Sequence, residues 1–182
     1  MAEAETSAFA LRAQAVPERR VALVTGASRG IGLGIALRLA EEGFYVVGTA
    51  TSAVGIERID AALGAAGQGA LLQIEDAGSV TRLIEALDAG PGLPLVLVNN
   101  AGVRAYEPLA EARAETWQRI LSVNLLSYAF LTREALPSLR ASGRGAVVNI
   151  SSTHAFHPRA GMAQYDVAKA GIISMTRSLA FE

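Results

Sequence analysis

Five short apolar runs, separated by longer segments, divide the chain into a regular pattern. The runs are VALVT (21–25), FYVVGT (44–49), ALLQI (70–74), LPLVLV (93–98) and AVVNI (146–150). Each run is continuous rather than alternating, which is typical of a strand that is buried on both faces. The segments between them carry apolar residues at helical spacing, such as Ile31, Ile35 and Leu39, and several are bounded by glycine. The pattern predicts a β-α unit repeated five times.

This alternation constrains the fold strongly. Consecutive parallel strands need right-handed helical crossovers, so the helices must cover both faces of one parallel sheet. The predicted fold class is therefore α/β, a doubly wound, Rossmann-like parallel sheet. In such sheets ligands bind outside the carboxyl ends of the strands, near the switch in strand order. We therefore expect the functional residues directly after the apolar runs.

Length and charge narrow the class of protein further. At 182 residues the chain suits one domain, which we place at 21–182, after a flexible leader at 1–20 that lacks the apolar run of a signal peptide. A net charge of −1 gives no reason to expect nucleic acid or an anionic membrane as a partner. The chain has no cysteine, which excludes disulfides and thiolate metal sites. No apolar stretch approaches the length of a membrane span, so we expect a cytoplasmic protein.

The first apolar run leads into the stretch TGASRGIG, at 25–32. Gly26, Gly30 and Gly32 allow a tight turn and a close ligand approach, and the helix start that follows offers N–H groups to a phosphate. A glycine-rich turn without a ligand is the alternative. The stretch also fits the G-x-S-x-G nucleophile elbow of α/β-hydrolases, but no sheet precedes it to supply an oxyanion loop, so Ser28 is a poor nucleophile candidate.

The second run ends in GTATS, at 48–52, without the acidic residue that would bind a ribose 2′-hydroxyl in an NAD site. An acid at that position would repel a 2′-phosphate. Its absence, with Arg29 in the first turn and hydroxyls at Thr51 and Ser52, favours NADP(H) over NAD(H). The alternative for Arg29 is a solvated turn residue.

Polar residues also follow the fourth and fifth runs. Two amides in a row, Asn99 and Asn100, must be hydrogen-bonded at a buried strand end, either to neighbouring loops or to a ligand. Ser152 follows the fifth run, Tyr165 comes thirteen residues later, and Lys169 lies one helical turn beyond it. Residues at i and i+4 share a helix face, so the phenol and the ammonium are directed at one place.

This tyrosine and lysine can act together as a proton donor. A nearby cation stabilises a phenolate, which makes a tyrosine a better acid near neutral pH. Ser152 could then hold the carbonyl oxygen that receives the proton. The Y-x-x-x-K spacing alone also fits an ordinary surface helix, so its weight comes from the motifs at the other strand ends.

Together, TGASRGIG, NNAG (99–102), the SVNLLS stretch with Asn124, ISS (150–152) and YDVAK (165–169) resemble the short-chain dehydrogenase/reductase family. The order and spacing match from about residue 21 to residue 182. Within the family, TGASRGIG and GTATS look most like 3-oxoacyl-[acyl-carrier-protein] reductases, which are NADPH-dependent and serve fatty acid biosynthesis.

The resemblance implies a role for each motif residue. It implies that Tyr165 is the general acid/base, that Lys169 binds the nicotinamide ribose and favours the phenolate, that Ser152 orients the substrate carbonyl and that Asn124 holds a water of the proton relay. The hydride would come from the nicotinamide C4, so the protein supplies placement and a proton. The implied cofactor site consists of Tyr165 and Lys169 with Thr25, Gly26, Ser28, Arg29, Gly30, Ile31, Gly32, Thr51, Gln73, Ile74, Asn99, Ala101 and Gly102.

Three features depart from the family pattern. Gln73-Ile74 stands where an acid or amide followed by valine is usual, and 93–95 lacks the aspartate that opens the fourth strand in many members. Family members also continue beyond the helix carrying Tyr165 into further strands and a substrate-covering helix. Without them the fifth strand is a bare edge and the substrate pocket lacks a wall. We therefore expect these residues to be a truncated domain, part of a longer protein.

The two histidines lie in the loop between Ser152 and Tyr165. A metal site would need at least one more ligand, and that loop offers none, so we predict no metal. His154 and His157 then line the substrate pocket or face solvent.

Two helical segments are apolar on more than one face: 117–136 and the segment that carries Tyr165. Such helices need cover on both sides. A partner subunit would give it, and the family resemblance implies a homodimer or homotetramer. Burial by a missing C-terminal portion is the alternative.

These observations favour an NADPH-dependent reductase of a ketone, with a 3-oxoacyl thioester as the substrate. An alternative is a dehydrogenase of a sugar, a steroid or another secondary alcohol. A catalytically silent module that binds the cofactor or oligomerises is a third hypothesis, which the presence of Asn124, Ser152, Tyr165 and Lys169 disfavours.

Overall fold

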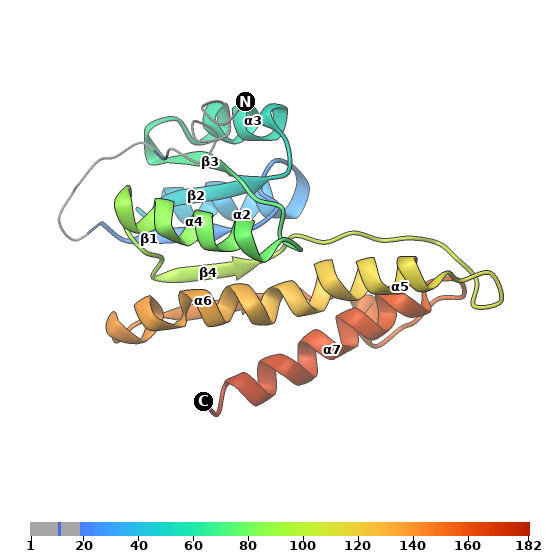
Figure 1. Cartoon of the computed structure of the whole chain (residues 1–182). Helices are drawn as coiled ribbons and strands as arrows, with labels where there is room; N and C mark the ends of the chain where they lie inside the picture. Colours follow the sequence, from blue (N-terminus) through green and yellow to red (C-terminus); the bar gives the residue numbers. More distant parts are fainter. Residues whose placement is uncertain (1–10, 12–18) are drawn as a thin grey trace.

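The computed structural model describes Leu11 and residues 19–182. Five strands form one parallel sheet in the order β3-β2-β1-β4-β5 (Figure 1). They are β1 (Val21–Val24), β2 (Tyr45–Ala50), β3 (Gly67–Leu71), β4 (Val96–Asn99) and β5 (Ala146–Asn149). The predicted Rossmann-like parallel sheet is confirmed. The predicted leader lies almost wholly outside the described residues and stays a prediction.

Helices connect the strands. They are α2 (Gly30–Glu41), α3 (Ala53–Leu63), α4 (Ala77–Ala89), α5 (Ala114–Leu121), α6 (Ser127–Ala141) and α7 (Ala163–Leu179), with 3-10 turns at Gly64–Ala66 and Thr153–Ala155 and a π-helical turn at Ser122–Leu126. Because β1 pairs with β2 on one side and β4 on the other, the strand order reverses between β1 and β4. This reversal is the switch point at which a ligand is expected.

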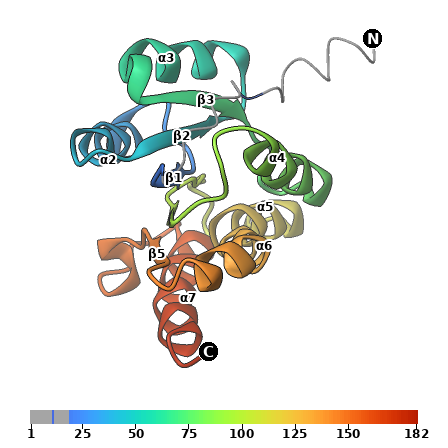
Figure 2. The ribbon, with the colours of Figure 1, turned by 90° about the vertical axis from the view of Figure 1, so that its left-hand side faces the viewer.

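Each face of the sheet carries its own hydrophobic core. Successive residues of a strand point to opposite faces, so Leu23 belongs to the core under α4 and α6 whereas Val24 belongs to the core under α2 and α3. Figure 2 shows α2 and α4 on opposite sides of the sheet. Burial on both faces explains why the strands read as continuous apolar runs.

The third strand begins earlier than predicted. Its residues are GQGAL rather than the expected ALLQI, a shift of three positions. A Cβ on Gly67 would lie 2.3 Å from the carbonyl oxygen of Val46, and one on Gly69 would lie 2.8 Å from that of Ile56. The close approach of β2 and α3 thus requires glycines, which the search for apolar runs passes over.

The segment predicted as one helix over 117–136 is interrupted. The π-helical turn at Ser122–Leu126 separates α5 from α6 and contains Asn124, which is fully buried. A π-turn changes the i→i+4 hydrogen-bond pattern locally and is frequent at functional sites. No apolar period in the sequence marks it.

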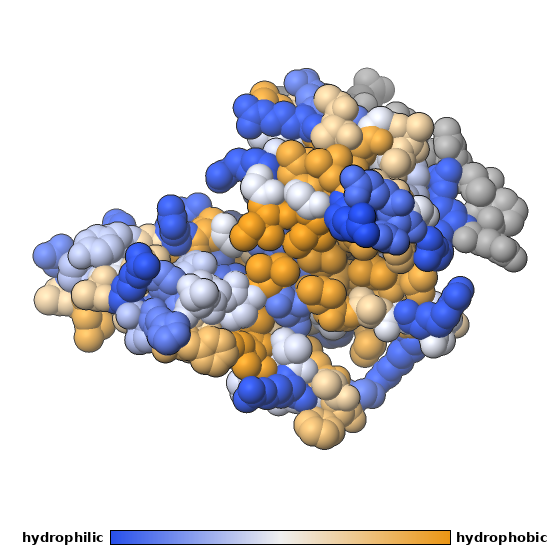
Figure 3. All heavy atoms as spheres, turned by 180° about the vertical axis from the view of Figure 1, so that it is seen from behind, coloured by the Kyte–Doolittle hydropathy of each residue, from blue (hydrophilic) through white to orange (hydrophobic). Residues whose placement is uncertain are grey.

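The edge of the sheet that β5 forms is more open to solvent. Strand β5 pairs with β4 alone, and Val148 at this edge is 45% exposed. A broad apolar area occupies the middle of the face opposite to that of Figure 1 (Figure 3). Within the described part of the chain, no helix has both the length and the apolar character needed to cross a membrane.

Candidate active site

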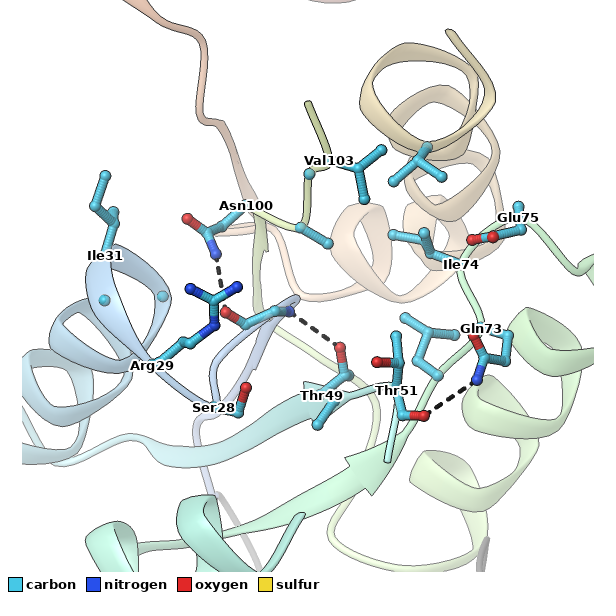
Figure 4. Close-up of a pocket in the computed structure, with 18 of the residues that line it drawn as sticks. Ser28, Arg29, Ile31, Thr49, Thr51, Gln73, Ile74, Glu75, Asn100 and Val103 are labelled. Atoms are coloured by element: carbon cyan, nitrogen blue, oxygen red, sulfur yellow. Dashed lines mark hydrogen bonds between the residues drawn. The ribbon is translucent and has the colours of Figure 1, made fainter. Parts of the chain in front are cut away.

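A cavity of about 610 Å³ opens at the carboxyl ends of β1, β2, β3 and β4 (Figure 4). It lies where the strand order reverses, as the fold rule for ligand sites predicts. Eleven of the predicted cofactor residues line it: Gly26, Ser28, Arg29, Gly30, Ile31, Gly32, Thr51, Gln73, Ile74, Ala101 and Gly102. These residues come from four separate loops, which the tertiary fold brings to one place.

The turn between β1 and α2 is shaped for a ligand that needs backbone contact. Gly26 and Gly30 have φ values of +66° and +57°, a region that favours glycine. A Cβ on Gly32 would come 2.2 Å from the carbonyl oxygen of Gly26, so only glycine fits there. Arg29 occupies the N-cap of α2 in extended conformation and gives no side-chain cap. The first N–H groups of α2 are therefore open to an anion.

Thr25 and Asn100 hold this turn in place. The Thr25 hydroxyl accepts hydrogen bonds from the backbone N–H groups of Asn100 and Ala101, both at 2.9 Å. The Asn100 amide donates to the carbonyl oxygens of Thr25 (2.8 Å) and Gly26 (3.1 Å). Thr25 is fully buried behind the cavity wall, so the structure assigns it to loop positioning rather than to the lining.

The end of β2 presents hydroxyl groups beside the cavity. Thr49 accepts a hydrogen bond from the N–H of Gly26 at 3.2 Å, and Gln73 donates to the carbonyl oxygen of Thr51 at 3.2 Å. Both bonds are drawn in Figure 4, where Arg29 approaches from the opposite side of the cavity to Gln73. Ser52 does not face the cavity, because its hydroxyl accepts from Gly55 and caps α3.

Asn99, predicted near the cofactor, is fully buried and does not line the cavity. Its amide donates to the Asn149 oxygen at 2.8 Å and to the Thr132 hydroxyl at 3.1 Å. Asn149 in turn donates to Thr176 on α7 at 2.9 Å. The first asparagine of the pair therefore joins β4 to β5 and α6, and the second joins β4 to the β1–α2 turn.

Lys169 lies deep in the site, with 4% of its surface exposed. Its ammonium donates to the carbonyl oxygen of Ile150 at 2.9 Å and to the Tyr128 hydroxyl at 3.5 Å, and it lies 5.9 Å from the centroid of the Tyr165 ring. Burial lowers the pKa of Lys169 to about 8. Burial also raises the pKa of Tyr128, with a smaller contribution from Tyr165, so Tyr128 stays a neutral donor to Ala101.

Asn124 uses its side chain to hold the loop after β4. Its oxygen accepts from the N–H of Val103 at 2.8 Å and its nitrogen donates to the Val103 carbonyl at 2.7 Å. A Cβ on Gly102 would lie 2.8 Å from the Asn124 oxygen and 3.7 Å from the Lys169 nitrogen. Gly102 thus sits against both side chains. Because both polar atoms of the Asn124 side chain are bonded to Val103, a relay water held by Asn124 would have to bind to the backbone carbonyl of Asn124.

Ser152 and Tyr165 are connected through the loop between them. The Ser152 hydroxyl accepts from the N–H of His154 at 3.2 Å, and the His154 ring stands edge-on to the Tyr165 ring at 5.5 Å and 87°. The neighbouring Ser151 hydroxyl donates to the backbone carbonyl of Lys169 at 2.7 Å. The bond of Ser151 joins the end of β5 to α7, and His154 contacts both Ser152 and Tyr165.

Comparison with known proteins agrees with this geometry. The model of the short chain dehydrogenase family matches residues 20–182. The 3-oxoacyl-[acyl-carrier-protein] reductase FabG of Escherichia coli (strain K12) is 39% identical over 165 residues, which cover 91% of this chain and 68% of the relative. The FabG of Pseudomonas aeruginosa is 40% identical over 166 residues, 90% of this chain and 67% of the relative.

The chain belongs to the short-chain dehydrogenase family. It is an NAD(P)-dependent oxidoreductase of the short-chain dehydrogenase/reductase type. The chain spans about two thirds of the length of the curated relatives that it matches.

The cavity of this short-chain dehydrogenase fits a nicotinamide dinucleotide. The uncapped N-terminus of α2, the Gly32 position that a Cβ would obstruct and the open space around Gly30 together leave room for a pyrophosphate against the backbone. When bound, the cofactor supplies the hydride that is transferred. The residues from β1, β2 and β3 would hold its adenosine and phosphates, and those after β4 its nicotinamide half.

Several lining residues of the short-chain dehydrogenase were missed by sequence reasoning, including Thr49, Val103, Arg119 and Glu75. Asn100, which the sequence predicts to bond either a neighbouring loop or a ligand, lines the cavity and also bonds the β1–α2 turn. Arg119 and Glu75 come from helix α5 and the loop after β3, and no motif marks them. Ser28 lines the cavity, whereas neither His154 nor His157 lines it.

Proposed function

We propose that the protein reduces a ketone with NADPH, and that its substrate is a 3-oxoacyl thioester. The observation that carries the proposal is the position of buried Lys169, 5.9 Å from the Tyr165 ring, with His154 in contact with both Tyr165 and Ser152. Tyr165 donates the proton to the carbonyl oxygen, Ser152 orients that oxygen, and Lys169 stabilises the phenolate that remains. Asn124 supports the relay by holding the loop at Val103.

The choice of substrate rests on similarity. FabG relatives at about 39–40% identity are named 3-oxoacyl-[acyl-carrier-protein] reductases. A dehydrogenase of a sugar, a steroid or another secondary alcohol would run the same hydride transfer in the opposite direction, so a panel of the corresponding ketones separates these substrates. The reaction would take place in the cytoplasm.

The experiment is NADPH oxidation against a panel of ketones that includes acetoacetyl thioesters, beside the variant Tyr165→Phe. Loss of the proton donor should reduce turnover by roughly 10²- to 10⁴-fold, while the affinity for NADPH stays within about twofold. Tyr165 does not line the cavity, which is why binding should persist. If Tyr165→Phe reduces ketones as fast as the parent, the assigned acid is wrong.

The proposed preference for NADP(H) rests on residues at the end of β2 and in the turn between β1 and α2. Thr51 lines the cavity where an NAD site has an acid, and the Arg29 guanidinium extends towards the middle of the cavity. Glu75 also lines it, but from the loop after β3 and on the far side from Arg29. A guanidinium beside a phosphate forms a charge-assisted contact, which favours NADP(H).

The variant Arg29→Ala tests this preference. The dissociation constant for NADPH should rise about tenfold, equivalent to about 1.4 kcal/mol, whereas that for NADH should change little. Fluorescence titration of both cofactors against both proteins measures the two constants. Tighter binding of NADH than NADPH by the parent would overturn the preference.

We also propose that the protein assembles as a homodimer or homotetramer. The apolar side chains of Leu126, Phe130 and Val167 on the π-turn, α6 and α7 are 46–50% exposed in the single chain. Exposed apolar residues on neighbouring helices favour burial against a second subunit.

A further inference from the structure

A second pair of polar side chains lies next to the proposed proton donor. The His154 Nδ1 atom is 2.8 Å from an oxygen of Asp166, and both side chains are largely buried, at 16% and 10% exposure. Asp166 is the residue after Tyr165 on α7, and His154 is the second residue after Ser152. The pair therefore joins the two segments that supply the proposed catalytic groups.

The hydrogen bonds of Asp166 define the state of the imidazole. One carboxylate oxygen is bonded to His154, and the other accepts from the backbone N–H of Arg159 at 3.0 Å. A carboxylate only accepts hydrogen bonds, so His154 must donate from Nδ1. A neutral ring then carries its proton on Nδ1 and has a free lone pair on Nε2.

His154 contacts both members of the proposed serine and tyrosine pair. Its ring stands edge-on to the Tyr165 ring, with the centroids 5.5 Å apart. Its backbone N–H donates to the Ser152 hydroxyl at 3.2 Å, which limits the directions in which that hydroxyl points. Lys169 lies 5.9 Å from the centroid of the same tyrosine ring. The Tyr165 ring thus has a cation and an anchored imidazole as neighbours.

We propose that His154 and Asp166 form a positioning dyad that holds the Tyr165 ring and the Ser152 hydroxyl in the orientation for proton transfer. The proposal rests on the proposed function, because it gives the dyad a role in the same reaction. Asp166 fixes the imidazole. The imidazole in turn packs perpendicular to the phenol ring and restricts the movement of that ring. A misplacement of reacting groups by about 1 Å can reduce a rate by roughly 10²-fold, so such a restriction has kinetic weight.

The dyad differs from a structural loop contact in a measurable way. A pair that only ties the loop at 153–161 to α7 would affect unfolding and leave the rate per active molecule unchanged. Loss of a positioning dyad should instead lower kcat in folded protein, with little change in KM or in cofactor affinity. Neither His154 nor Asp166 lines the nucleotide cavity, so cofactor binding serves as an internal control.

The first test needs no turnover and uses the full chain labelled with ¹⁵N. Long-range ¹H–¹⁵N correlation of the imidazole rings reports which nitrogen carries the proton. His154 should be protonated at Nδ1, whereas His157, an exposed histidine three residues along the same loop, should show the averaged signal of a free ring. An Nε2–H tautomer, or averaging like that of His157, would overturn the dyad.

The second test removes the two side-chain contacts of His154 one at a time. His154→Phe keeps an aromatic edge beside Tyr165 but lacks the N–H, and His154→Asn keeps an N–H donor for Asp166 but lacks the ring. Each should lower kcat by roughly 10- to 100-fold with KM within about threefold. Asp166→Asn should do the same, because an amide has one acceptor oxygen for two donors. The double variant His154→Phe/Asp166→Asn should lose no more than the larger single loss.

His157→Ala is the matched control and should retain the parent kcat. Circular dichroism and NADPH titration of each variant establish that the compared proteins are folded and loaded. A kcat equal to that of the parent in folded His154→Phe and His154→Asn would overturn the proposal. So would a loss confined to KM, which would make His154 a substrate contact. A parent protein that reduces no ketone would contradict the proposed function, and the tautomer measurement would still decide the dyad.

Discussion

The nucleotide side of the molecule and the catalytic side are built by different means. On the nucleotide side, β1 and β2 are buried, and the turn that begins the cavity is shaped by Gly26, Gly30 and Gly32. On the catalytic side, α7 and the π-helical turn at Ser122–Leu126 place the buried polar side chains of Lys169 and Asn124, which hydrogen bonds hold in position. Under the proposed function, the first region would bind the cofactor through close backbone contact and the helix dipole, and the second would act through positioned charge.

The difference extends to the edges of the sheet. At the β3 edge three of the five strand residues are buried and two are half-buried, whereas the residues of β5 alternate between exposed and half-buried. The catalytic side compensates with a line of polar bonds from Asn99 through Asn149 to Thr176, which ties β4 to β5 and α7. Substitutions that add bulk should therefore have the largest effects on the nucleotide side. Substitutions that remove a charge should have the largest effects on the catalytic side.

The largest effect is expected for Lys169→Met. Loss of the cation should reduce ketone turnover by roughly 10²- to 10⁴-fold. The same change should stabilise the protein without cofactor at pH 7, because the lowered pKa of Lys169 means that its charge is buried unfavourably. A pKa of about 8 against 10.5 corresponds to about 3 kcal/mol, from which the lost bond to Ile150 subtracts about 1 kcal/mol.

Chemical denaturation of both proteins at pH 7, beside NADPH oxidation, measures the two effects. A Lys169→Met protein that is less stable than the parent would show that the bond to Ile150 outweighs desolvation. Catalysis and stability would then both favour lysine at position 169. The catalytic side would in that case show no cost in stability for its buried charge.

A smaller but sharper effect is expected on the nucleotide side. Gly32→Ala places a methyl 2.2 Å from the Gly26 oxygen and 2.5 Å from the Asn100 nitrogen, so the turn must shift. It should destabilise the fold by about 1–3 kcal/mol and weaken NADPH binding by a similar free energy. Gly34→Ala in the same helix meets nothing within 4 Å and should stabilise by about 0.4–1 kcal/mol.

Thermal unfolding and NADPH titration of the two variants measure this contrast between neighbouring glycines. Equal effects of Gly32→Ala and Gly34→Ala would mean that close packing at the turn does not govern binding.

The smallest effect concerns pH. Lys169 loses its proton near pH 8, so kcat/KM for ketone reduction should be level below about pH 7 and fall about tenfold per unit well above 8. Between about pH 8 and 10.5 the unfolded chain binds a proton that the folded chain has released, so this lysine makes stability rise with pH in that window. Rates and denaturation curves across pH 6 to 10 check both directions, and the stability slope should be smaller in Lys169→Met.

Much of this site was predictable because its residues follow strand ends. The apolar runs predicted the sheet, and the sheet predicted that TGASRGIG, NNAG and the Tyr165 helix meet at one edge. The start of β3 was misplaced because Gly67 and Gly69 serve close packing rather than burial of side chains. Thr25, Asn99 and Ser52 were expected beside the cofactor from their place in the motifs, yet each hydroxyl or amide is used to hold a neighbouring element.

The parallel α/β sheet, the family and the residues that could carry acid-base chemistry were predictable from the sequence alone, because these depend on local periodicity and on short motifs. The tertiary structure decided which of those residues face the cavity, that Lys169 is buried against Ile150, and that Asp166 anchors His154 beside Tyr165. Burial and side-chain pairing depend on segments far apart in the chain that meet only when the sheet forms. The identities of neighbouring residues in the chain do not reveal these contacts.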